Sequence, residues 1–352
     1  LGRESELTII DGRGRVVTIN KPVERIATAY SSAESEMLRT LKVTEKVVGV
    51  DEYTSKDTVF FPELSKLPTY GWGPYLDYEA LLALNPDFVI TATYDMDWVD
   101  QLLQVCQDAG ITVVCFSYLD GEEFVLDYTI KLGYTLDSEE EAKKFIDFVQ
   151  HSTDEIEEKV KDIPEDDKPK VYVESLYGEW RAASRMSPPG SHCPIAGGRN
   201  IAADLPIPGE GGGPSVCSIE VDAEWVIKQN PDVIIRMGGL GSFGFGGASG
   251  YDADDPSDMK ALRDEIMNRP ELANVKAVKT GQVYVMSCTA LISPTYCIGV
   301  PYMAKAFYPD LFSDVNANGI HQEYLTEFQG LDYDLDEHGV FIYHPVYFPE
   351  GR

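Results

Sequence analysis

The sequence predicts a mixed α/β protein built from two doubly wound lobes that are joined by a single long helix. Three observations lead to this prediction. A helix–turn–strand pattern occurs at residues 76–90 (LDYEALLALNPDFVI) and again at residues 221–235 (VDAEWVIKQNPDVII). Strand and helix signals alternate around both copies, as they do in parallel sheets. A charged amphipathic stretch at residues 138–162 separates the copies and is long enough to bridge two lobes.

The two copies of the pattern align without a gap, so that Asp77 matches Asp222 and Asn85 matches Asn230. Each aspartate can cap a short helix. Asn-Pro-Asp then ends that helix, because proline disfavours the helical conformation in the residue before it. The runs FVI and VII that follow are typical of buried strands. A unit repeated at this distance indicates two similar domains. We expect the apolar residues of the two helices to face inward, namely Leu81, Leu82, Leu84, Val226 and Ile227.

The first lobe, residues 1–137, alternates strands with helices after an opening hairpin. Asp11-Gly12 lies between two alternating apolar runs, which is typical of a β-hairpin. Ser31 can cap the first helix. This order predicts a Rossmann-like lobe. The expected elements are a hairpin at 7–19, strands at 25–30, 47–50 and 112–116, helices at 31–41 and 98–109, and an aromatic, proline- and glycine-rich loop at 51–75.

The connecting helix is expected at residues 138–163, where an acidic first turn favours the helix N-terminus. Residues 164–352 form the second lobe, which repeats the alternation of the first. Its expected elements are strands at 170–174 and 282–286, an irregular segment at 177–205 that includes a helix at 195–204, helices at 259–267 and 294–307, and an aromatic, acidic tail at 310–352 that packs on the lobe.

The composition indicates a folded protein with a strongly acidic surface. The formal net charge is −30, yet 43% of the residues are apolar, which argues against disorder. Such a charge repels phosphates, so we expect no nucleic-acid partner. No apolar run is long enough to span a membrane. The chain starts at Leu1 without a signal peptide, and we expect a mature or trimmed form that a lipid anchor could have preceded.

Motifs of enzymes and of metal-binding modules are missing from the chain. None of the six cysteines forms a C-x-x-C pair, which excludes zinc-ribbon and thioredoxin-like motifs. Their even number permits disulfides outside the cytoplasm, and buried free thiols explain it equally well. No G-x-S-x-G, P-loop or H-E-x-x-H motif occurs, so an enzyme is the weaker alternative. The glycine-rich run at 238–250 contains G-x-G-x-x-G but lacks a following helix, which favours a rim of the ligand site over a nucleotide site.

The predicted lobes, the connecting helix and the duplicated D-x-E…N-P-D pattern occur together with the opening phrase KPVERIATAYSSAESEMLRTLKVTEKVVGV. In this combination, residues 7–310 resemble the class III periplasmic binding proteins. These are the substrate-binding proteins of ABC importers for iron-siderophore complexes, haem and cobalamin. The resemblance implies an extracytoplasmic monomer that is not an enzyme and has no intrinsic cofactor. It also implies a ligand cleft between the lobes and small motions about the connecting helix.

The resemblance further implies a membrane partner, the ABC permease. Members of this family carry one glutamate on each lobe that docks to an arginine pocket of the permease, and by position these correspond to Glu79 and Glu224. A carboxylate in the first turn is also favoured by the helix dipole, and duplication of an ancestral domain would repeat it. The shared register in both lobes favours docking over these two explanations.

Ligand contacts are expected beyond the carboxyl ends of the strands, where open α/β sheets bind their ligands. Aromatic faces there suit a planar or chelated ligand, and arginines pair with anionic oxygens. With the resemblance, this implies a metal chelate such as an iron-siderophore complex, haem or a corrinoid. Taken singly, each aromatic residue could be core packing, and Arg236 could form a salt bridge. The candidates are Tyr30, Trp72, Tyr94 and Tyr118 in the first lobe, and Trp180, Arg181, Arg185, Arg236, Phe243, Phe245 and Tyr296 in the second.

Direct capture of zinc or manganese is an alternative within the binding proteins. Such a site needs about three or four convergent His, Asp or Glu ligands, and only His192 lies near the expected cleft. The segment at 186–193 departs from the family pattern, and His192 there could act as an axial ligand of a metal centre or could be a surface-loop histidine. A metal-cluster protein of nitrogenase type is disfavoured, because the cysteines are not at the expected strand ends.

Overall fold

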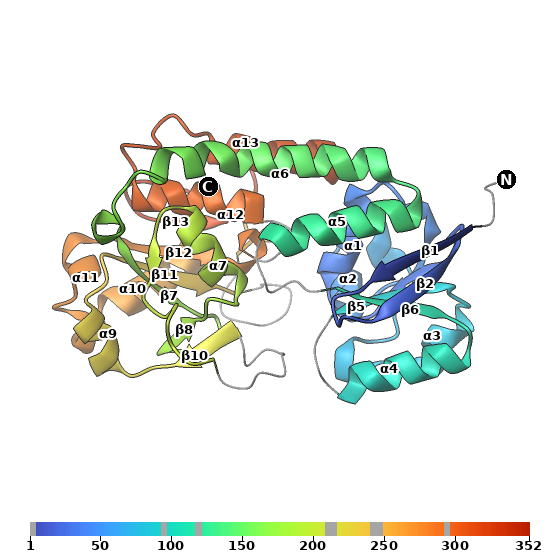
Figure 1. Ribbon diagram of the computed structural model, residues 1–352. Helices are drawn as coiled ribbons and strands as arrows, with labels where there is room; N and C mark the ends of the chain where they lie inside the picture. The colour runs from blue at the N-terminus through green and yellow to red at the C-terminus, as the bar shows by residue number, and fades with distance from the viewer. Residues whose placement is uncertain (1–4, 93–96, 117–121, 208–216, 240–248, 292–295) are drawn as a thin grey trace. The chain divides into compact units, whose positions relative to one another are not determined.

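The computed structural model describes residues 5–92, 97–116, 122–207, 217–239, 249–291 and 296–352 (Figure 1). The described chain divides into two compact units. Unit 1 contains residues 5–116 and 122–148, and unit 2 contains the described residues from Val149 onward. The division falls within α6 (Glu139–Val160), the helix that was expected to connect the lobes.

Unit 1 is built on a parallel sheet with the strand order β4-β3-β5-β6. Every residue of β3 and β5 is buried, as expected for strands that are covered on both faces. The chain moves from β3 to one edge of the sheet and from β5 to the other, so the topological switch point lies between these two strands. The strands are β3 (Ile26–Thr28), β4 (Val47–Gly49), β5 (Phe88–Ala92) and β6 (Thr112–Phe116).

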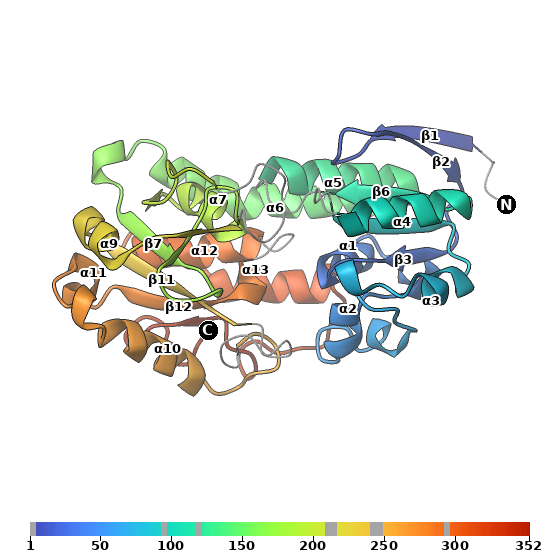
Figure 2. The ribbon, with the colours of Figure 1, turned by 90° about the horizontal axis from the view of Figure 1, so that it is seen from below.

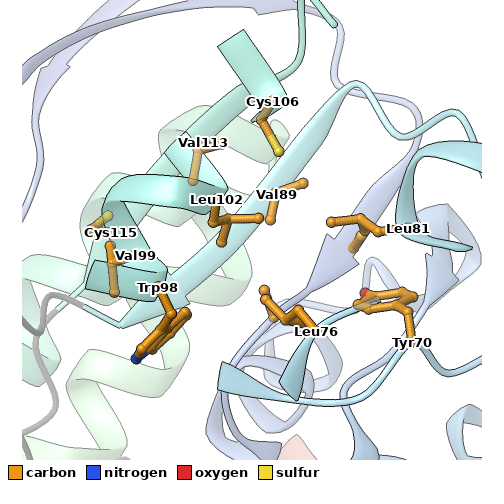
Figure 3. Close-up of a cluster of buried hydrophobic side chains, with 12 residues drawn as sticks. Tyr70, Leu76, Leu81, Val89, Trp98, Val99, Leu102, Cys106, Val113 and Cys115 are labelled. Atoms are coloured by element: carbon orange, nitrogen blue, oxygen red, sulfur yellow. The ribbon is translucent and has the colours of Figure 1, made fainter. Parts of the chain in front are cut away.

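Helices cover both faces of the unit 1 sheet. In Figure 1, α3 and α4 lie on one side of the strands, and α1 and α5 lie on the other. Figure 3 shows Leu81 of α3 and Leu102 of α4 beside Val89 of β5 in the core that the first pair forms. On the other side, the hydroxyl of Thr129 in α5 lies 3.7 Å from the sulfur of Met37 in α1. The helices are α1 (Ser32–Thr40), α3 (Tyr78–Ala83), α4 (Asp97–Asp108) and α5 (Glu122–Leu136).

Most predicted elements of unit 1 are confirmed. The hairpin is β1 (Ser5–Ile10) paired with β2 (Val16–Lys21), and α1 begins at the expected Ser31 cap. Helix α5 was not predicted, because its apolar residues are not confined to one face. Ile130 and Tyr134 are about half exposed, at 44% and 55%. The loop at 51–75 contains α2 (Glu52–Lys56), η2 (Leu64–Lys66) and η3 (Gly73–Tyr75), and η1 (Thr44–Lys46) precedes β4.

Unit 2 repeats the strand order of unit 1. Its parallel strands are arranged as β9-β7-β11-β12, so that the first strand again lies between the second and the third. The switch point of unit 2 therefore lies between β7 and β11. The parallel strands are β7 (Lys170–Glu174), β9 (Arg199–Asn200), β11 (Val233–Gly238) and β12 (Val283–Ser287), and β8 (Arg181–Ala183), β10 (Ser218–Glu220) and β13 (Ile342–Tyr343) extend the sheet as antiparallel strands.

Helices α9, α10 and α11 pack on the unit 2 sheet through one core, in which Val226 and Ile266 meet Ile234 of β11. Figure 2 shows β7, β11 and β12 side by side, with α10 next to β12. Helix α7 contacts β7, β9 and α12. As predicted, the tail packs on this lobe, because β13 pairs with β12. The helices are α7 (Pro188–Ile195), α9 (Ala223–Gln229), α10 (Ser257–Met267), α11 (Lys276–Thr280), α12 (Tyr296–Phe307) and α13 (Ala317–Glu323), with a π-helix at Tyr324–Phe328 and 3₁₀ turns η4 (Glu165–Asp167), η6 (Pro270–Leu272) and η7 (Cys288–Ala290).

The two repeated turns have the same geometry. Asn85 and Asn230 both adopt the left-handed conformation, with φ of 48° and 50°, which asparagine tolerates well. Asp87 accepts hydrogen bonds of 3.0 and 3.1 Å from the backbone amides of the two residues before β3. Asp232 accepts one of 2.8 Å from the first amide of β7. The Asn-Pro-Asp sequence therefore ties each turn to the start of the first parallel strand of its unit.

The prediction of an irregular segment at 177–205 is wrong. Strands β8 and β9 flank helix α7, which starts within the expected loop, and β9 occupies part of the helix expected at 195–204. Ser187 caps α7 through a 3.2 Å bond from the amide of Gly190, and the two prolines of the first turn need no amide partner. The helix also depends on tertiary contact, because a Cβ at Gly190 would lie 1.9 Å from the carbonyl oxygen of Ser184.

The inward orientation predicted for the repeated helices holds for only part of the set. Leu81 and Val226 are fully buried, whereas Leu82 and Leu84 are half-buried. The prediction for Ile227 is wrong, since this side chain is 40% exposed. Successive residues point about 100° apart around a helix axis. A short helix that packs on one side can therefore bury Val226 and leave the next residue, Ile227, exposed.

The six cysteines are free thiols; five are buried and Cys217 is partly exposed. Burial raises the pKa of Cys217 to about 11 and that of Cys106 to about 12, so these thiols stay protonated near neutral pH. Across the ranges that the structure describes, no helix combines the length and the apolar character that a membrane span requires.

Candidate functional site

Unit 1 carries a group of aromatic rings at the carboxyl end of β3, beside the switch point. We call Tyr30, Tyr53, Trp72, Tyr75 and Trp98 the aromatic cluster. Tyr30 stacks on Trp98 with ring centroids 5.6 Å apart and planes 8° from parallel. Trp72 lies 6.3 Å from Tyr30, 4.9 Å from Tyr53 and 5.7 Å from Tyr75. The structure thus brings the predicted residues Tyr30 and Trp72 together and adds three rings that the sequence analysis missed.

Glycines hold the Trp72 turn against the end of β3. The amide of Gly73 donates a 3.1 Å hydrogen bond to the carbonyl of Ala29, the residue before Tyr30. Gly71 has a φ of 89°, and a Cβ there would lie 2.3 Å from the carbonyl oxygen of Tyr75. Only glycine adopts this positive φ without strain and leaves room for the carbonyl oxygen of Tyr75, because it has no Cβ. The backbone therefore determines where the Trp72 ring lies relative to Tyr30.

A buried carboxylate, Asp51, positions Tyr53. Asp51 caps α2 by accepting from the amide of Thr54 at 2.9 Å, and it accepts from the hydroxyl of Thr28 in β3 at 3.0 Å. Burial raises the pKa of Asp51, and its hydrogen bonds oppose this rise. Burial and the charge of Asp51 also raise the pKa of Tyr53. The Tyr53 hydroxyl therefore stays protonated and can donate to an anionic oxygen.

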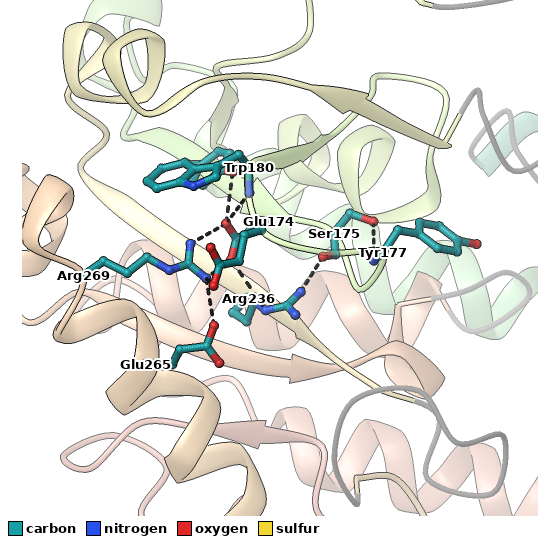
Figure 4. Close-up of polar contacts among 9 residues, drawn as sticks. Glu174, Ser175, Tyr177, Trp180, Arg236, Glu265 and Arg269 are labelled. Atoms are coloured by element: carbon teal, nitrogen blue, oxygen red, sulfur yellow. Dashed lines mark hydrogen bonds and ion pairs between the residues drawn. The ribbon is translucent and has the colours of Figure 1, made fainter.

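The switch point of unit 2 holds a buried carboxylate between two guanidinium groups (Figure 4). We call Glu174, Arg236 and Arg269 the charge group. Glu174, the last residue of β7, is fully buried and receives bonds of 2.6 and 3.0 Å from Arg269. Arg236 lies opposite Glu174 on β11, with Nε 3.5 Å from a carboxylate oxygen, and donates through Nη1 to the carbonyl of Ser175.

Arg236 was predicted as a ligand contact, with a salt bridge as the alternative. The structure contains the salt bridge, and the Arg236 side chain is only 10% exposed. Its Nη2 forms no hydrogen bond to a described residue, so the guanidinium keeps donors for a ligand. Contact with a ligand therefore stays a prediction.

Trp180 is tied to the charge group and to the core of unit 2. Its amide donates a 3.1 Å bond to Glu174, and the guanidinium of Arg269 lies 5.2 Å from its ring centroid. The ring also packs against the core beneath α9 and α10. In the same turn, Tyr177 is 48% exposed. Figure 4 shows its ring lying away from the charge group. Tyr177 is thus the more accessible aromatic side chain of this turn.

The other two predicted arginines have partners within unit 2. Arg181 lies 3.7 Å from the carboxylate of Glu220, and both side chains are accessible to solvent. Arg185 is exposed and donates 3.3 Å bonds to the carbonyls of Ala203 and Leu205. Exposed contacts of this kind add little stability, so both arginines can exchange these partners for a ligand.

His192 and Tyr296 are buried side by side, with ring centroids 5.5 Å apart. The interpretation of His192 as a surface-loop residue is wrong, because the residue lies within α7 and is fully buried. Neither imidazole nitrogen has a hydrogen-bond partner among the described residues, and burial lowers the pKa of His192 to about 3. Among the described residues, no three His, Cys, Asp or Glu side chains converge on a common point. The predicted contacts Tyr94, Tyr118, Phe243 and Phe245 lie outside the described residues.

The two glutamates expected to dock to a permease have equivalent surroundings. Glu79 and Glu224 are exposed in the first turns of α3 and α9. The capping function is performed by the aspartates before them, because Asp77 and Asp222 accept bonds of 3.0 and 2.7 Å from backbone amides. Neither glutamate forms a hydrogen bond or an ion pair with the part of the chain that the structure describes. Both carboxylates are therefore available to a partner.

The sequence analysis missed Tyr53, Tyr75, Trp98, Glu174 and Arg269. Trp98 could have been found, since it begins the helix that follows β5 and is therefore near a strand end. Glu174 ends β7, but a buried acid is hard to recognise in a chain with 59 acidic residues. Arg269 follows α10 and reaches the charge group only through the packing of that helix, so no strand-end rule points to it.

Comparison with known proteins identifies the family. A model of the family described as "Periplasmic binding protein" matches residues 27–288. YvrC of Bacillus subtilis, an uncharacterised ABC transporter substrate-binding lipoprotein, is 24% identical over 311 residues, which are 88% of this chain and 87% of YvrC.

Solved structures of periplasmic binding proteins share the fold. FepB, a TroA-like periplasmic binding protein of Veillonella parvula, superposes with a TM-score of 0.75 and 24% identity over 96% of this chain and 99% of its own. MolA of Haemophilus influenzae, solved with bound molybdate, gives 0.73 and 20% over 93% and 99%.

These matches agree with the two α/β units of the structure. The family consists of transport proteins that bind substrates outside the cytoplasm and are not enzymes. The chain is therefore a member of the periplasmic binding protein family, an extracytoplasmic substrate-binding protein of an ABC transporter.

Proposed function

We propose that this protein delivers a metal chelate, of the iron-siderophore, haem or corrinoid type, to an ABC permease. The aromatic cluster at the switch point of unit 1 carries the proposal, because open α/β sheets bind ligands at this place. Its rings offer faces for a flat or chelated ligand, and Tyr75 is 73% exposed. The chelate is cargo, and the protein works as a monomer without a cofactor of its own.

Unit 2 supplies the positive charge that an anionic chelate requires. The charge group combines one carboxylate with two guanidiniums in a chain whose net charge is −30. Arg181 and Arg185 add accessible guanidiniums in the same unit. Catecholate, hydroxamate and carboxylate oxygens all accept the charge-assisted bonds that such groups donate. Guanidiniums gathered at this switch point of an acidic protein support an anionic ligand.

A metal oxyanion is the second candidate ligand, because the relative MolA was solved with molybdate. The charge group fits an oxyanion as well as it fits a chelate. The aromatic cluster favours the chelate, since a small tetrahedral anion has no flat face to stack on. Direct binding of zinc or manganese is the third candidate and would involve His192, whose nitrogens have no partner in the part of the chain that the structure describes.

We also propose that Glu79 and Glu224 dock to basic residues of the permease. Two features support this role: the glutamates have no partners among the described residues, and neighbouring aspartates cap the helices instead. Each glutamate is the second residue after the aspartate that caps its helix, so the two carboxylates occupy the same position of the first turn. An exposed carboxylate without an internal partner loses no existing contact when it pairs with an arginine.

A titration followed by tryptophan fluorescence tests the ligand class. The probes are ferric catecholate and hydroxamate complexes, haemin, cobalamin, molybdate, zinc and manganese. We expect one chelate to quench the fluorescence saturably. The substitution Trp72→Phe should weaken the affinity for that chelate at least tenfold. Trp225→Phe is the control, because Trp225 packs against the core of unit 2. A response to molybdate alone or to the bare metals alone would contradict the chelate and establish the corresponding alternative.

Charge reversal tests the docking surface. The double variant Glu79→Lys/Glu224→Lys should abolish uptake through the protein's own transporter and leave chelate affinity unchanged. The matched control is Glu45→Lys/Glu271→Lys, which changes the net charge equally at exposed positions of the two units. Normal uptake by the first variant, or equal loss in both, would refute the assignment of Glu79 and Glu224.

A further inference from the structure

The buried carboxylate of Glu174 organises the switch point of unit 2. It receives the two bonds of Arg269, the Nε contact of Arg236 and the amide of Trp180. The hydroxyl of Tyr172 donates a further bond of 3.3 Å. A carboxylate that loses its hydration is stable only when hydrogen bonds and opposite charge replace the water, and Glu174 obtains both from these groups.

The two arginines have different functions around this carboxylate. Arg269 makes the short bonds to Glu174 and lies 3.1 Å from Glu265, so its charge is largely compensated. Arg236 approaches Glu174 only to 3.5 Å, and its single hydrogen bond to a described residue is to the carbonyl of Ser175. Arg236 therefore has the weaker compensation of the two guanidiniums, and its positive charge is the less neutralised one.

The same contacts hold the turn that follows β7. Trp180 has a φ of 55°, a conformation that a non-glycine residue adopts only when its surroundings compensate. Glu174 bonds the amide of Trp180, and Arg236 bonds the carbonyl of Ser175, so the two ends of the turn depend on the charge group. Figure 4 shows the Arg236 guanidinium between Glu174 and this carbonyl, with Tyr177 beyond it.

We propose that Glu174 is a positioning residue for anion recognition by Arg236. Glu174 orients the guanidinium at the switch point, and Arg269 compensates the carboxylate so that the positive charge of Arg236 remains available to an anionic oxygen. The proposal rests on the proposed function, in which Arg236 contacts the ligand. It adds that the affinity for an anion depends on a carboxylate that the anion does not touch.

Two substitutions separate orientation from charge. Glu174→Asp keeps the charge but shortens the side chain by one methylene, about 1.5 Å, so it releases Arg236 and Trp180. Glu174→Gln removes the charge while keeping the length. If Glu174 only neutralised Arg236, the glutamine variant would bind anions more tightly and the aspartate variant would be unchanged. If Glu174 orients Arg236, both variants bind anions at least tenfold more weakly.

The probes are the ferric complex of 2,3-dihydroxybenzoate and sodium molybdate, titrated calorimetrically against the whole protein. Glu265→Gln is the matched control, because the carboxylate of Glu265 pairs with Arg269 and does not contact Arg236. We expect this control to stay within about twofold of the unsubstituted protein. In a double-variant cycle, Glu174→Asp should weaken binding no further in a protein that already carries Arg236→Lys, since coupled residues are not additive.

Each outcome has a defined meaning. Unchanged affinity in Glu174→Asp, tighter binding in Glu174→Gln, or additive effects in the cycle would overturn the proposal. If the aspartate variant does not fold, as judged by circular dichroism, the direction of change in the glutamine variant decides. If neither anion binds but cobalamin or a neutral chelate does, this inference fails and the proposed transport function stands. If Arg236→Lys leaves anion affinity unchanged, the contact assigned to Arg236 fails as well.

Discussion

Replacing the buried His192 with phenylalanine tests whether unit 2 contains a neutral imidazole. Burial lowers the pKa of His192 from 6.5 to about 3, and neither nitrogen forms a hydrogen bond to a residue that the structure describes. The unfolded chain binds this proton near the ordinary pKa, whereas the native protein does not. The contribution of His192 to stability is therefore complete above the unfolded pKa and is lost as the pH falls toward the native one.

The magnitude follows from the two pKa values. At about pH 5, the unfolded state gains roughly 2 kcal/mol from protonation of this histidine relative to about pH 7.5. His192→Phe removes that term and also removes a buried polar group that has no partner, which costs about 1–3 kcal/mol when present. We expect the variant to be at least as stable as the unsubstituted protein near neutral pH, and to lose roughly 2 kcal/mol less on acidification.

Urea unfolding followed by circular dichroism at the two pH values measures this difference. His151→Gln is the control, because His151 is exposed on α6 and is solvated in both states. Its acid sensitivity should match that of the unsubstituted protein. Equal acid sensitivity of the His192→Phe variant and the unsubstituted protein would refute the reasoning, because it would mean that His192 takes up its proton in the native state.

Two further sets of substitutions test local structure. Gly190→Ala should destabilise the protein by about 3 kcal/mol or more, since its Cβ would lie 1.9 Å from the carbonyl oxygen of Ser184. The control Pro194→Ala, on the same helix, should not destabilise the protein. Equal melting temperatures of the Gly190→Ala and Pro194→Ala variants would contradict the close approach of Gly190 to Ser184. Asp87→Ala and Asp232→Ala should each cost about 1–2 kcal/mol in urea unfolding, because each aspartate bonds the backbone at the start of a strand. An effect in one repeat only would show that the two turns are not equivalent.

Local patterns were sufficient to predict the elements that the sequence marks at both ends. The repeated turns were found because aspartate caps, Asn-Pro-Asp stops and short apolar runs lie within a few residues of one another. The helix α1 begins at its predicted serine for the same reason. The connecting helix α6 was recognised from its length, its acidic first turn and its apolar stripe.

Elements that depend on distant contacts were missed or placed wrongly. Helix α5 shows no clean apolar face in the sequence, since it buries residues such as Val125 and Leu132 while leaving Ile130 and Tyr134 about half exposed. Helix α7 contains prolines and glycine, which disfavour helices in isolation, and it is stabilised by its cap and by packing against α12.

The candidate site divides in the same way. Tyr30 and Trp72 could be predicted, because ligands of open sheets bind beyond strand ends and the strand that leads to Tyr30 is clear in the sequence. The charge group could not be predicted, because Arg269 is far from Glu174 in the sequence and no local pattern marks a buried ion pair. The side chain that compensates a buried charge is chosen by three-dimensional proximity.

The sequence by itself determined two similar α/β units, their connecting helix, and the family, since these follow from local periodicity and from a pattern that occurs twice. The tertiary structure decided which polar groups are buried and with what partners. Only folding placed His192 in a dry interior and the charge group at a switch point. The physical reason is that hydrophobic periodicity is a property of neighbouring residues, whereas desolvation and charge compensation depend on atoms that the chain brings together from distant positions.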